Sequence, residues 1–237
     1  LHAPGSPSHN TLKGVLLTLL GTLCLSTVPV ISKLALSDIP SLHFSAIWMV
    51  LCTIWASAWM LIRHGRSSWS QIRTRWGPVL LTGIFATAWV FFYFAGLERL
   101  DPAVVTFIMN SRIVLAIAVG GIFLGERYSS LQVVGIVAVV GGVVVIFSDV
   151  QEPGDVLGSA FVLLAALFFV LSSTVVRVRA RSVSVELLLL SRFLLPALVL
   201  VPLSFIAGSP FGYLTRNTML LMAGASLIGP FLSFLLI

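Results

Sequence analysis

The chain has 237 residues, of which 58% are hydrophobic and only 9% are charged, with a formal net charge of +6. A soluble globular domain has about 25% charged residues, so this composition excludes a soluble protein and indicates an integral membrane protein. The two cysteines lie inside apolar runs, and the four histidines lack metal-ligand spacing. No phosphate-binding Gly-Lys-Ser/Thr loop occurs either. We therefore predict no metal, no cofactor and no enzymatic activity.

Eight apolar segments approach the length of about 20 residues that a helix needs to cross a bilayer. In chain order they are expected at 12–34, 42–62, 79–97, 102–124, 131–148, 156–178, 185–206 and 218–237. Asp101-Pro102 predicts a helix start at the fourth segment, and "SSLQ" (129–132) matches a capping box before the fifth. The predicted fold class is all-α, a polytopic transmembrane helix bundle. Because the chain begins with Leu1 and ends within an apolar run, we expect a piece of a longer protein.

The positions of the basic residues predict an orientation. With the N-terminus inside, nine lie on the cytoplasmic side: Lys13, Arg63, Arg66, Arg73, Arg75, Arg127, Arg177, Arg179 and Arg181. Three lie outside: Lys33, Arg99 and Arg216. Since cytoplasmic loops of membrane proteins are enriched in Lys and Arg, this distribution favours an N-terminus inside. It also accounts for the positive charge without nucleic acid, and basic loops of this kind suit contact with anionic membrane lipid.

A weak internal repeat of opposite orientation is visible. Gly14 precedes Lys33 by nineteen residues, and Gly158 precedes Arg177 by the same distance, at an offset of 144 residues. This offset spans five segments, an odd number, so the second copy would enter the membrane from the other side. Inverted repeats are a common plan of secondary transporters, although two hydrophobic helices can also share such anchors by coincidence.

Longer stretches carry a family resemblance. The stretch "LERLDPAVVTFIMNSRIVLAIAVGGIFLGERYSSLQVVGIVAVVGGVVVIF" (97–147) joins a Gly125-Glu126 turn to a Gly-rich fifth helix, and "LLLLSRFLLPALVL" (187–200) holds an Arg-Phe pair. Both stretches resemble EamA-type members of the drug/metabolite transporter superfamily. The resemblance implies ten helices in two inverted five-helix repeats, here 12–148 and a truncated 156–237.

The chain departs from that family pattern in two places. The position that matches Arg192 in the first half is Trp48, and the mid-helix proline frequent in the family's fourth helix is replaced by "NSRI" (110–113).

Arg112 is the leading candidate for substrate binding. It lies near the middle of the fourth segment, and no Asp or Glu lies in the middle of any segment. A central arginine costs roughly 2.5–3.5 kcal/mol on insertion scales, so a role should offset that cost. Arg112 could face an aqueous cavity and pair with a carboxylate or phosphate of a substrate. It could instead bond to the carbonyls of a broken helix.

Three further residues are candidates for the same site. Arg192 lies seven residues into its segment and could join Arg112 or extend to the interface. Trp48 begins an aromatic stripe that could line a substrate path or pack against a neighbouring helix. Asn110 shares a face with Thr106, which also fits hydrogen bonding between helices. "SST" (172–174) has the same two readings.

Four residues are assigned structural roles. Lys33 and Arg177 are predicted interfacial anchors, and Gly125 with Glu126 is predicted to form a structural turn between the fourth and fifth helices.

The prediction for function is a secondary transporter that moves a small polar or amphipathic metabolite by alternating access, and it could be an exporter. The expected location is a bacterial cytoplasmic membrane, and the expected partners are a small-molecule substrate, membrane lipid and, in a homodimer, a second copy. Two alternatives stay open: a polytopic membrane enzyme acting on a lipid-linked anionic substrate, and a non-transporting receptor or scaffold.

Overall fold

A computed structural model describes residues 9–64, 69–125, 129–148, 153–179 and 183–232, and all regular structure in these ranges is helical. Within them, six stretches are long and apolar enough to cross a membrane. They are Gly14–Leu36, Ser41–Ile62, Trp76–Arg99, Pro102–Ile122, Val156–Arg179 and Val185–Ala207. These stretches confirm the predicted polytopic helical bundle.

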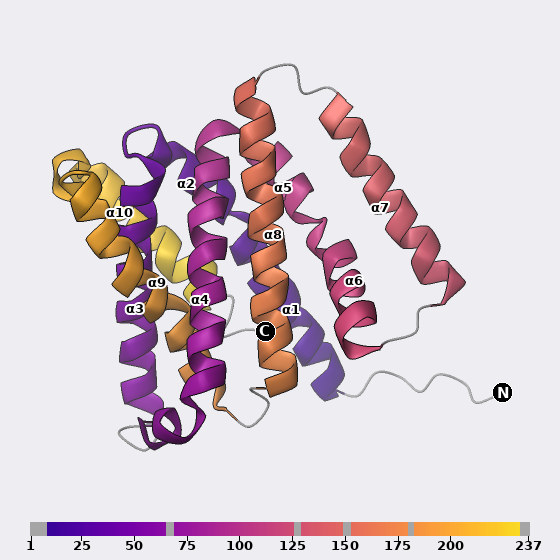
Figure 1. Cartoon of the computed structure of the whole chain (residues 1–237). Helices are drawn as coiled ribbons and strands as arrows, with labels where there is room; N and C mark the ends of the chain where they lie inside the picture. The colour runs from indigo at the N-terminus through magenta and orange to yellow at the C-terminus, as the bar shows by residue number, and fades with distance from the viewer. Residues whose placement is uncertain (1–8, 65–68, 126–128, 149–152, 180–182, 233–237) are drawn as a thin grey trace.

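The elements follow one another as drawn in Figure 1. They are α1 (His9–Ser26), α2 (Val28–Leu36), α3 (Ser41–His64), α4 (Trp69–Arg99), α5 (Pro102–Met109), α6 (Arg112–Leu124), α7 (Ser130–Ser148), α8 (Pro153–Arg179), α9 (Val185–Ala207), the short 3-10 helix η1 (Pro210–Tyr213), α10 (Arg216–Ser226) and the π-helical η2 (Leu227–Leu232). The fifth predicted segment corresponds to α7, and the eighth corresponds to α10 with η2.

Two segments predicted as single helices are interrupted. The first breaks at Thr27, directly before Val28 and Pro29, because proline lacks the N–H that a helix interior requires. The fourth breaks at Asn110 and Ser111, where backbone bonds close over three residues: Asn110 N–H donates to the Phe107 carbonyl and Ser111 N–H to that of Ile108. Asn and Ser favour such turns, because their side chains compete with the helix backbone. Arg112 is consequently the first residue of α6.

The predicted helix starts are largely confirmed. The Ser129 N–H donates to the Gln132 side chain at 2.8 Å and the Gln132 N–H donates to the Ser129 hydroxyl at 3.4 Å, which is the reciprocal pairing of a capping box. Asp101 is the N-cap of α5 and Pro102 follows it, although the Asp101 side chain makes no capping bond.

The core of the bundle lies among α3, α4, α8 and α9. Helix α4 packs along α8 and α9, and α3 packs along α9. Aromatic side chains fill the centre: Phe44 stacks on Trp48, and both rings meet the edge of Phe94. The tight packing fixes the frame against which α5 and α6 are placed.

The close approach of α4 to α8 depends on small residues. A Cβ atom added at Gly96 would lie 2.5 Å from Cγ2 of Val162 and 3.0 Å from the backbone oxygen of Gly158. Val162 is fully buried, so it has little room to move away. Because small residues are what let membrane helices approach closely, Gly96 determines the spacing between α4 and α8.

We therefore expect Gly96→Ala to destabilise the protein. Overpacking of this kind costs about 1–3 kcal/mol, which exceeds the gain of about 1 kcal/mol from removing a helical glycine. Gly224→Ala in α10 is the matched control, because a Cβ there meets nothing within 4 Å. Thermal unfolding in detergent should place the midpoint of Gly96→Ala below that of Gly224→Ala. Equal midpoints would show that α4 and α8 separate without cost.

Helices five spans apart run in opposite directions. In Figure 1, α1 and α2 ascend from the end at which α8 terminates, whereas α8 descends toward that end. The contacts of helix α4 also have counterparts among the helices five spans away along the chain. Helix α4 meets α8 and α9, and α10 with η2 meets the counterparts of those two, α1–α2 and α3. This is the contact pattern expected of inverted repeats, whose boundaries at 12–148 and 156–237 stay a prediction.

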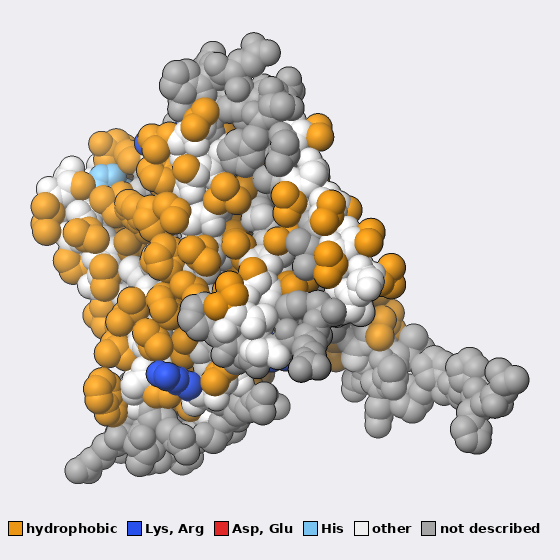
Figure 2. Space-filling view, turned by 45° about the vertical axis from the view of Figure 1, so that its right-hand side comes forward, with side chains coloured by type: hydrophobic (Ala, Val, Ile, Leu, Met, Phe, Trp, Pro, Cys, Tyr) orange, Lys and Arg blue, Asp and Glu red, His pale blue; other side chains and the backbone are white. Residues whose placement is uncertain are grey.

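The outer surface is apolar around the middle of the bundle. Figure 2 shows one face on which hydrophobic side chains cover the central zone and Lys or Arg side chains appear only near the two ends. Leu23 in α1, Ile84 in α4 and Leu198 in α9 lie in the middle of their spans and are 64%, 50% and 61% exposed. Such exposure would be unfavourable in water, whereas it suits contact with lipid chains.

Candidate functional site

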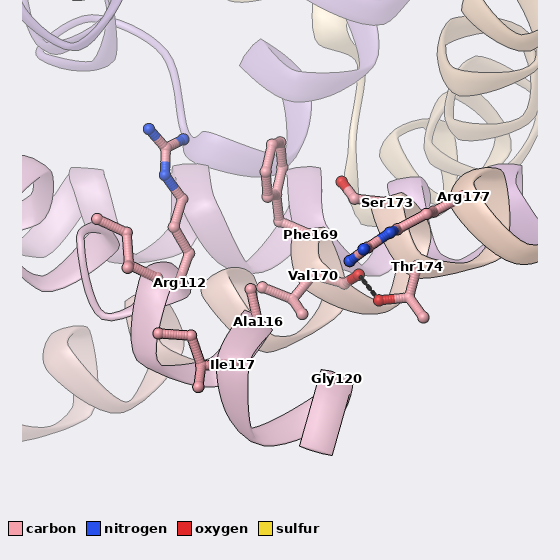
Figure 3. Close-up of a pocket in the computed structure, with 10 residues that line it drawn as sticks. Arg112, Ala116, Ile117, Gly120, Phe169, Val170, Ser173, Thr174 and Arg177 are labelled. Atoms are coloured by element: carbon pink, nitrogen blue, oxygen red, sulfur yellow. Dashed lines mark hydrogen bonds between the residues drawn. The ribbon is translucent and has the colours of Figure 1, made fainter. Parts of the chain in front are cut away.

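A pocket of about 420 Å³ lies between α6 and α8 (Figure 3). One wall is an α6 stripe of helical spacing, formed by Arg112, Ile113, Ala116, Ile117 and Gly120. The other wall comes from α8, with Phe169, Val170, Ser173, Thr174 and Arg177. Its volume is within the range of roughly 300–1,000 Å³ typical of small-molecule sites.

Arg112 reaches this pocket because the helix breaks immediately before it. As the first residue of α6 it lies at the positive end of that helix dipole. Its side chain is half-buried, and its guanidinium carbon lies 5.4 Å from the centre of the Phe169 ring. At that distance the ring face stabilises the cation by about 0.5–2 kcal/mol. Phe169 thus offsets part of the cost of a charge at this depth.

The ring of Phe169 is itself held by α4. Trp89 meets it edge to face, with ring centres 5.4 Å apart, and Trp89 also packs beside Tyr93. The indole N–H of Trp89 is buried and has no hydrogen-bond partner among the described residues. The same is true of the Ser111 hydroxyl next to Arg112. The indole N–H behind the Phe169 ring and the hydroxyl next to Arg112 therefore both have unused hydrogen-bonding capacity, which is uncommon in buried regions.

The "SST" stretch (172–174) was considered for hydrogen bonding between helices and for substrate contact, and its residues divide between these two roles. Ser172 donates a hydrogen bond of 3.2 Å to the carbonyl of Thr82 on α4, which is a contact between helices. Ser173 and Thr174 face the pocket. The hydroxyl of Thr174 already donates to its own helix at Val170, so Ser173 provides the more available hydroxyl.

The charge of the pocket is one-sided. Two of its described lining residues, Arg112 and Arg177, are cationic, and none of the described lining residues is Asp or Glu. Among the described residues, no ion pair to Arg112 occurs. Because a buried or half-buried cation is normally paired, the pocket is electrostatically prepared for an anion.

The other substrate-binding candidates lie outside this pocket. Arg192 is half-buried in α9 and does not line it. Trp48 is 2% exposed and packed between Phe44 and Phe94, so it acts as a core residue. Asn110 is exposed at the end of α5. The helix–helix bonding considered for its neighbour Thr106 is not observed, because the Thr106 hydroxyl donates to Pro102 within α5.

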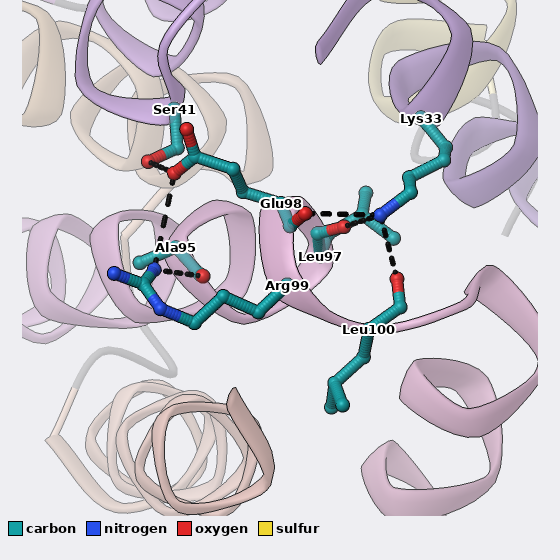
Figure 4. Close-up of polar contacts among 7 residues, drawn as sticks. All are labelled: Lys33, Ser41, Ala95, Leu97, Glu98, Arg99 and Leu100. Carbon is teal, nitrogen blue, oxygen red and sulfur yellow. Dashed lines mark hydrogen bonds and ion pairs between the residues drawn. The ribbon is translucent and has the colours of Figure 1, made fainter. Parts of the chain in front are cut away.

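Lys33 has a definite structural contact, drawn in Figure 4. From α2 its ammonium donates to the backbone oxygens of Leu97, Glu98 and Leu100, at 2.9, 3.0 and 2.9 Å. These carbonyls lie at the C-terminal end of α4, where helix carbonyls lack partners within the helix. We call this arrangement the Lys33 clamp. Its role as an interfacial anchor stays a prediction.

The same end of α4 is also tied to α3. Ser41 donates to the Glu98 carboxylate at 2.6 Å, and Arg99 lies 3.9 Å from that carboxylate. Arg99 further donates to the Ala95 carbonyl and lies over the Phe161 ring of α8. The α4 terminus is therefore joined to three other helices.

The remaining structural predictions concern the bundle's opposite end. Gly125 ends α6 with φ at 65° and ψ at 24°, a left-handed conformation that favours glycine, so the turn begins where predicted. Glu126 lies outside the described residues. Arg177 is exposed in the last turn of α8 and also lines the pocket. The sequence predicted it only as an interfacial anchor.

Sequence reasoning did not identify Phe169 or Trp89. Both lie in strongly apolar runs, where nothing distinguishes an aromatic ring that faces a pocket from one that faces lipid. The useful signal would have been Arg112 itself, because a cation at depth needs an aromatic face or an acceptor nearby.

Comparison with known families identifies the chain. The model of the EamA-like transporter family matches residues 12–148, which is more than half of the sequence. The chain belongs to the EamA-like transporter family. This EamA-like protein is therefore an integral membrane protein and, in general terms, a membrane transporter, and members of its family are not enzymes.

A solved structure supports the fold independently. A protein titled only "Crystal structure of protein" has a TM-score of 0.69 to the EamA-like chain at 21% identity, covering 94% of this chain and 77% of its own. At that identity the likeness concerns the fold alone. No curated protein sequence matches the chain.

Proposed function

We propose that this EamA-like protein is a secondary transporter that moves a small polar or amphipathic metabolite by alternating access. The observation that carries the proposal is the α6–α8 pocket, in which Arg112 stands at a helix break with no carboxylate partner among the described residues. Interrupted helices at membrane depth occur where the backbone lines a cavity or is buried in protein. Transporters use such interruptions to bind charged substrate groups.

The arrangement of the helices supports alternating access. Opposite directions of α1 and α8, with matching contacts of α4 and of α10 with η2, fit two halves that rock against each other around a site between them. The pocket lies between α6 and α8, which belong to different predicted repeats.

Orientation and location extend the same proposal. The ends of α3, α6 and α8 and the starts of α4 and α7 lie at one end of the bundle, which is the end to which the sequence assigns nine basic residues. We place this end in the cytoplasm of a bacterium, with the N-terminus inside, export as the transport direction and a homodimer as the candidate assembly.

Counterflow in liposomes tests the mechanism. Vesicles that contain the purified protein are loaded with an unlabelled mixture of small metabolites and diluted into traces of the same labelled compounds. An alternating-access carrier should accumulate at least one label transiently above its equilibrium level. The reason is that the excess unlabelled compound inside competes with the label for the binding site and slows the exit of the label. Equilibration without overshoot would indicate a channel, and absence of flux throughout would favour a receptor or scaffold.

A further inference from the structure

The α6–α8 pocket carries information about the charge of its ligand. Among the described residues that line it, Arg112 and Arg177 are charged and none is an acid. A ligand ammonium would therefore meet like charge, with no carboxylate available in the described lining to compensate it. A ligand carboxylate would be attracted to the Arg112 guanidinium, for which no ion pair occurs among the described residues.

Groups around Arg112 add to this preference. Arg112 opens α6, so it lies at the positive end of that helix dipole, which favours an anion there. The adjacent Ser111 is only 8% exposed and its hydroxyl has no partner among the described residues. Ser173 provides a further hydroxyl from α8. A carboxylate can accept hydrogen bonds from the Arg112 guanidinium and the Ser173 hydroxyl, whereas an ammonium cannot accept any.

The rest of the pocket is apolar. Ile113, Ala116, Ile117 and Gly120 form one stripe along α6, and Val170 faces them from α8. Seven residues of helix span about 10 Å, so the stripe is long enough to cover a short alkyl chain or an aryl ring attached to the charged group. The pocket would cover that apolar group while the arginine holds the charge.

The two arginines are spaced along the pocket. Arg177 follows Phe169 by eight residues on α8, which corresponds to about 12 Å along the helix axis. Figure 3 shows the Arg112 and Arg177 side chains on either side of Ser173 and Phe169. Because Arg177 is exposed in the last turn of α8, it can meet an anion at the mouth of the pocket, ahead of Arg112.

From these observations we infer that the α6–α8 pocket selects monocarboxylates with a compact apolar group and discriminates against the matching amino acids, amines and alcohols. The inference rests on the proposed function only in treating the selected monocarboxylate as a transported substrate. Binding selectivity belongs to the pocket itself and can be measured without transport.

Four compounds with the same phenyl ring and short chain provide the test: 3-phenylpropanoate, phenylalanine, phenethylamine and 3-phenylpropanol. Titration calorimetry with the full chain in detergent should give 3-phenylpropanoate at least tenfold tighter binding than each of the others. Phenylalanine differs from it only by the α-ammonium group, so this pair isolates the cost of a second charge. Equal or tighter binding of phenylalanine or phenethylamine, or no binding of 3-phenylpropanoate, would overturn the inference.

Two matched variants assign the selectivity to the pocket. Arg177→Gln should weaken 3-phenylpropanoate binding severalfold and leave 3-phenylpropanol unchanged. Arg179→Gln removes the same charge two residues further along α8, outside this pocket, and should change neither. Equal effects of the two variants would show a general surface charge effect and refute the site.

Liposome measurements separate this inference from the proposed function. Selective binding of 3-phenylpropanoate without flux would refute transport and retain the selectivity. Flux of phenylalanine that equals or exceeds that of 3-phenylpropanoate would refute the selectivity and retain transport.

Discussion

Replacing Arg112 with glutamine should reduce transport at least tenfold while leaving the protein inserted and as stable as before. Hydrogen bonds to a charged group contribute about 1.5–3 kcal/mol, and each 1.4 kcal/mol corresponds to a factor of ten in affinity. Glutamine keeps polarity and some length, so the lost quantity is the charge that meets the substrate. Counterflow in liposomes measures the loss.

Stability distinguishes a substrate-binding arginine from a structural one. Removing a cation that costs roughly 2.5–3.5 kcal/mol at membrane depth should outweigh the lost contact to the Phe169 ring, so the thermal midpoint in detergent should stay or rise. A lowered midpoint would mean that Arg112 holds the helices together. Unchanged counterflow would remove Arg112 from the site. Arg179→Gln is the charge-matched control and should leave both readouts unchanged.

The fold was largely predictable because one physical constraint dominates it. A backbone in lipid must satisfy its own hydrogen bonds, so apolar runs of sufficient length become helices. The helix starts at Pro102 and Ser130 followed from cap and turn chemistry, as did the end of α6 at Gly125. Each of these signals acts over a few residues and is therefore visible in the sequence.

The helix breaks were less accessible to sequence reasoning. The interruption before Val28 and Pro29 has a cause in the proline, yet Pro78, Pro196 and Pro202 lie inside α4 and α9 without ending them. Neighbouring helices can satisfy the groups that a proline releases, so the outcome depends on packing. The turn at Asn110 and Ser111 contains no proline at all.

The site was predictable only in part. Arg112 was identifiable, because an unpaired charge in an apolar run is unfavourable by itself. Its partners come from α8, more than fifty residues later, and depend on how α6 and α8 meet. Trp48 illustrates the opposite case: a residue chosen for its aromatic character turns out to be covered by Phe44 and Phe94, because burial is a property of the packed bundle.

Replacing Lys33 with methionine should produce a large loss of stability. Methionine retains the apolar stem, so the change removes the three hydrogen bonds of the Lys33 clamp to Leu97, Glu98 and Leu100. It also removes a cation from the C-terminal end of α4, where it is favoured by the helix dipole. Hydrogen bonds from charged donors contribute about 1.5–3 kcal/mol each. Since part of this end is exposed and water can replace some bonds, we expect a net loss of roughly 2–4 kcal/mol.

The thermal midpoint in detergent measures this loss, and Arg216→Met provides its control. Arg216 is an exposed cation in the first turn of α10, so its replacement should leave the midpoint within about one degree, as for most exposed substitutions. The comparison has a consequence for function, because the Lys33 clamp fastens α2 to the junction of α4 and α5, and α5 leads directly into the break that presents Arg112. If the clamp fixes that junction, Lys33→Met should also weaken binding of 3-phenylpropanoate at temperatures where the protein is still folded. An unchanged midpoint would show that water replaces the ammonium at no cost, and that the position of α5 is set by its packing against neighbouring helices, above all α8, and not by the Lys33 clamp.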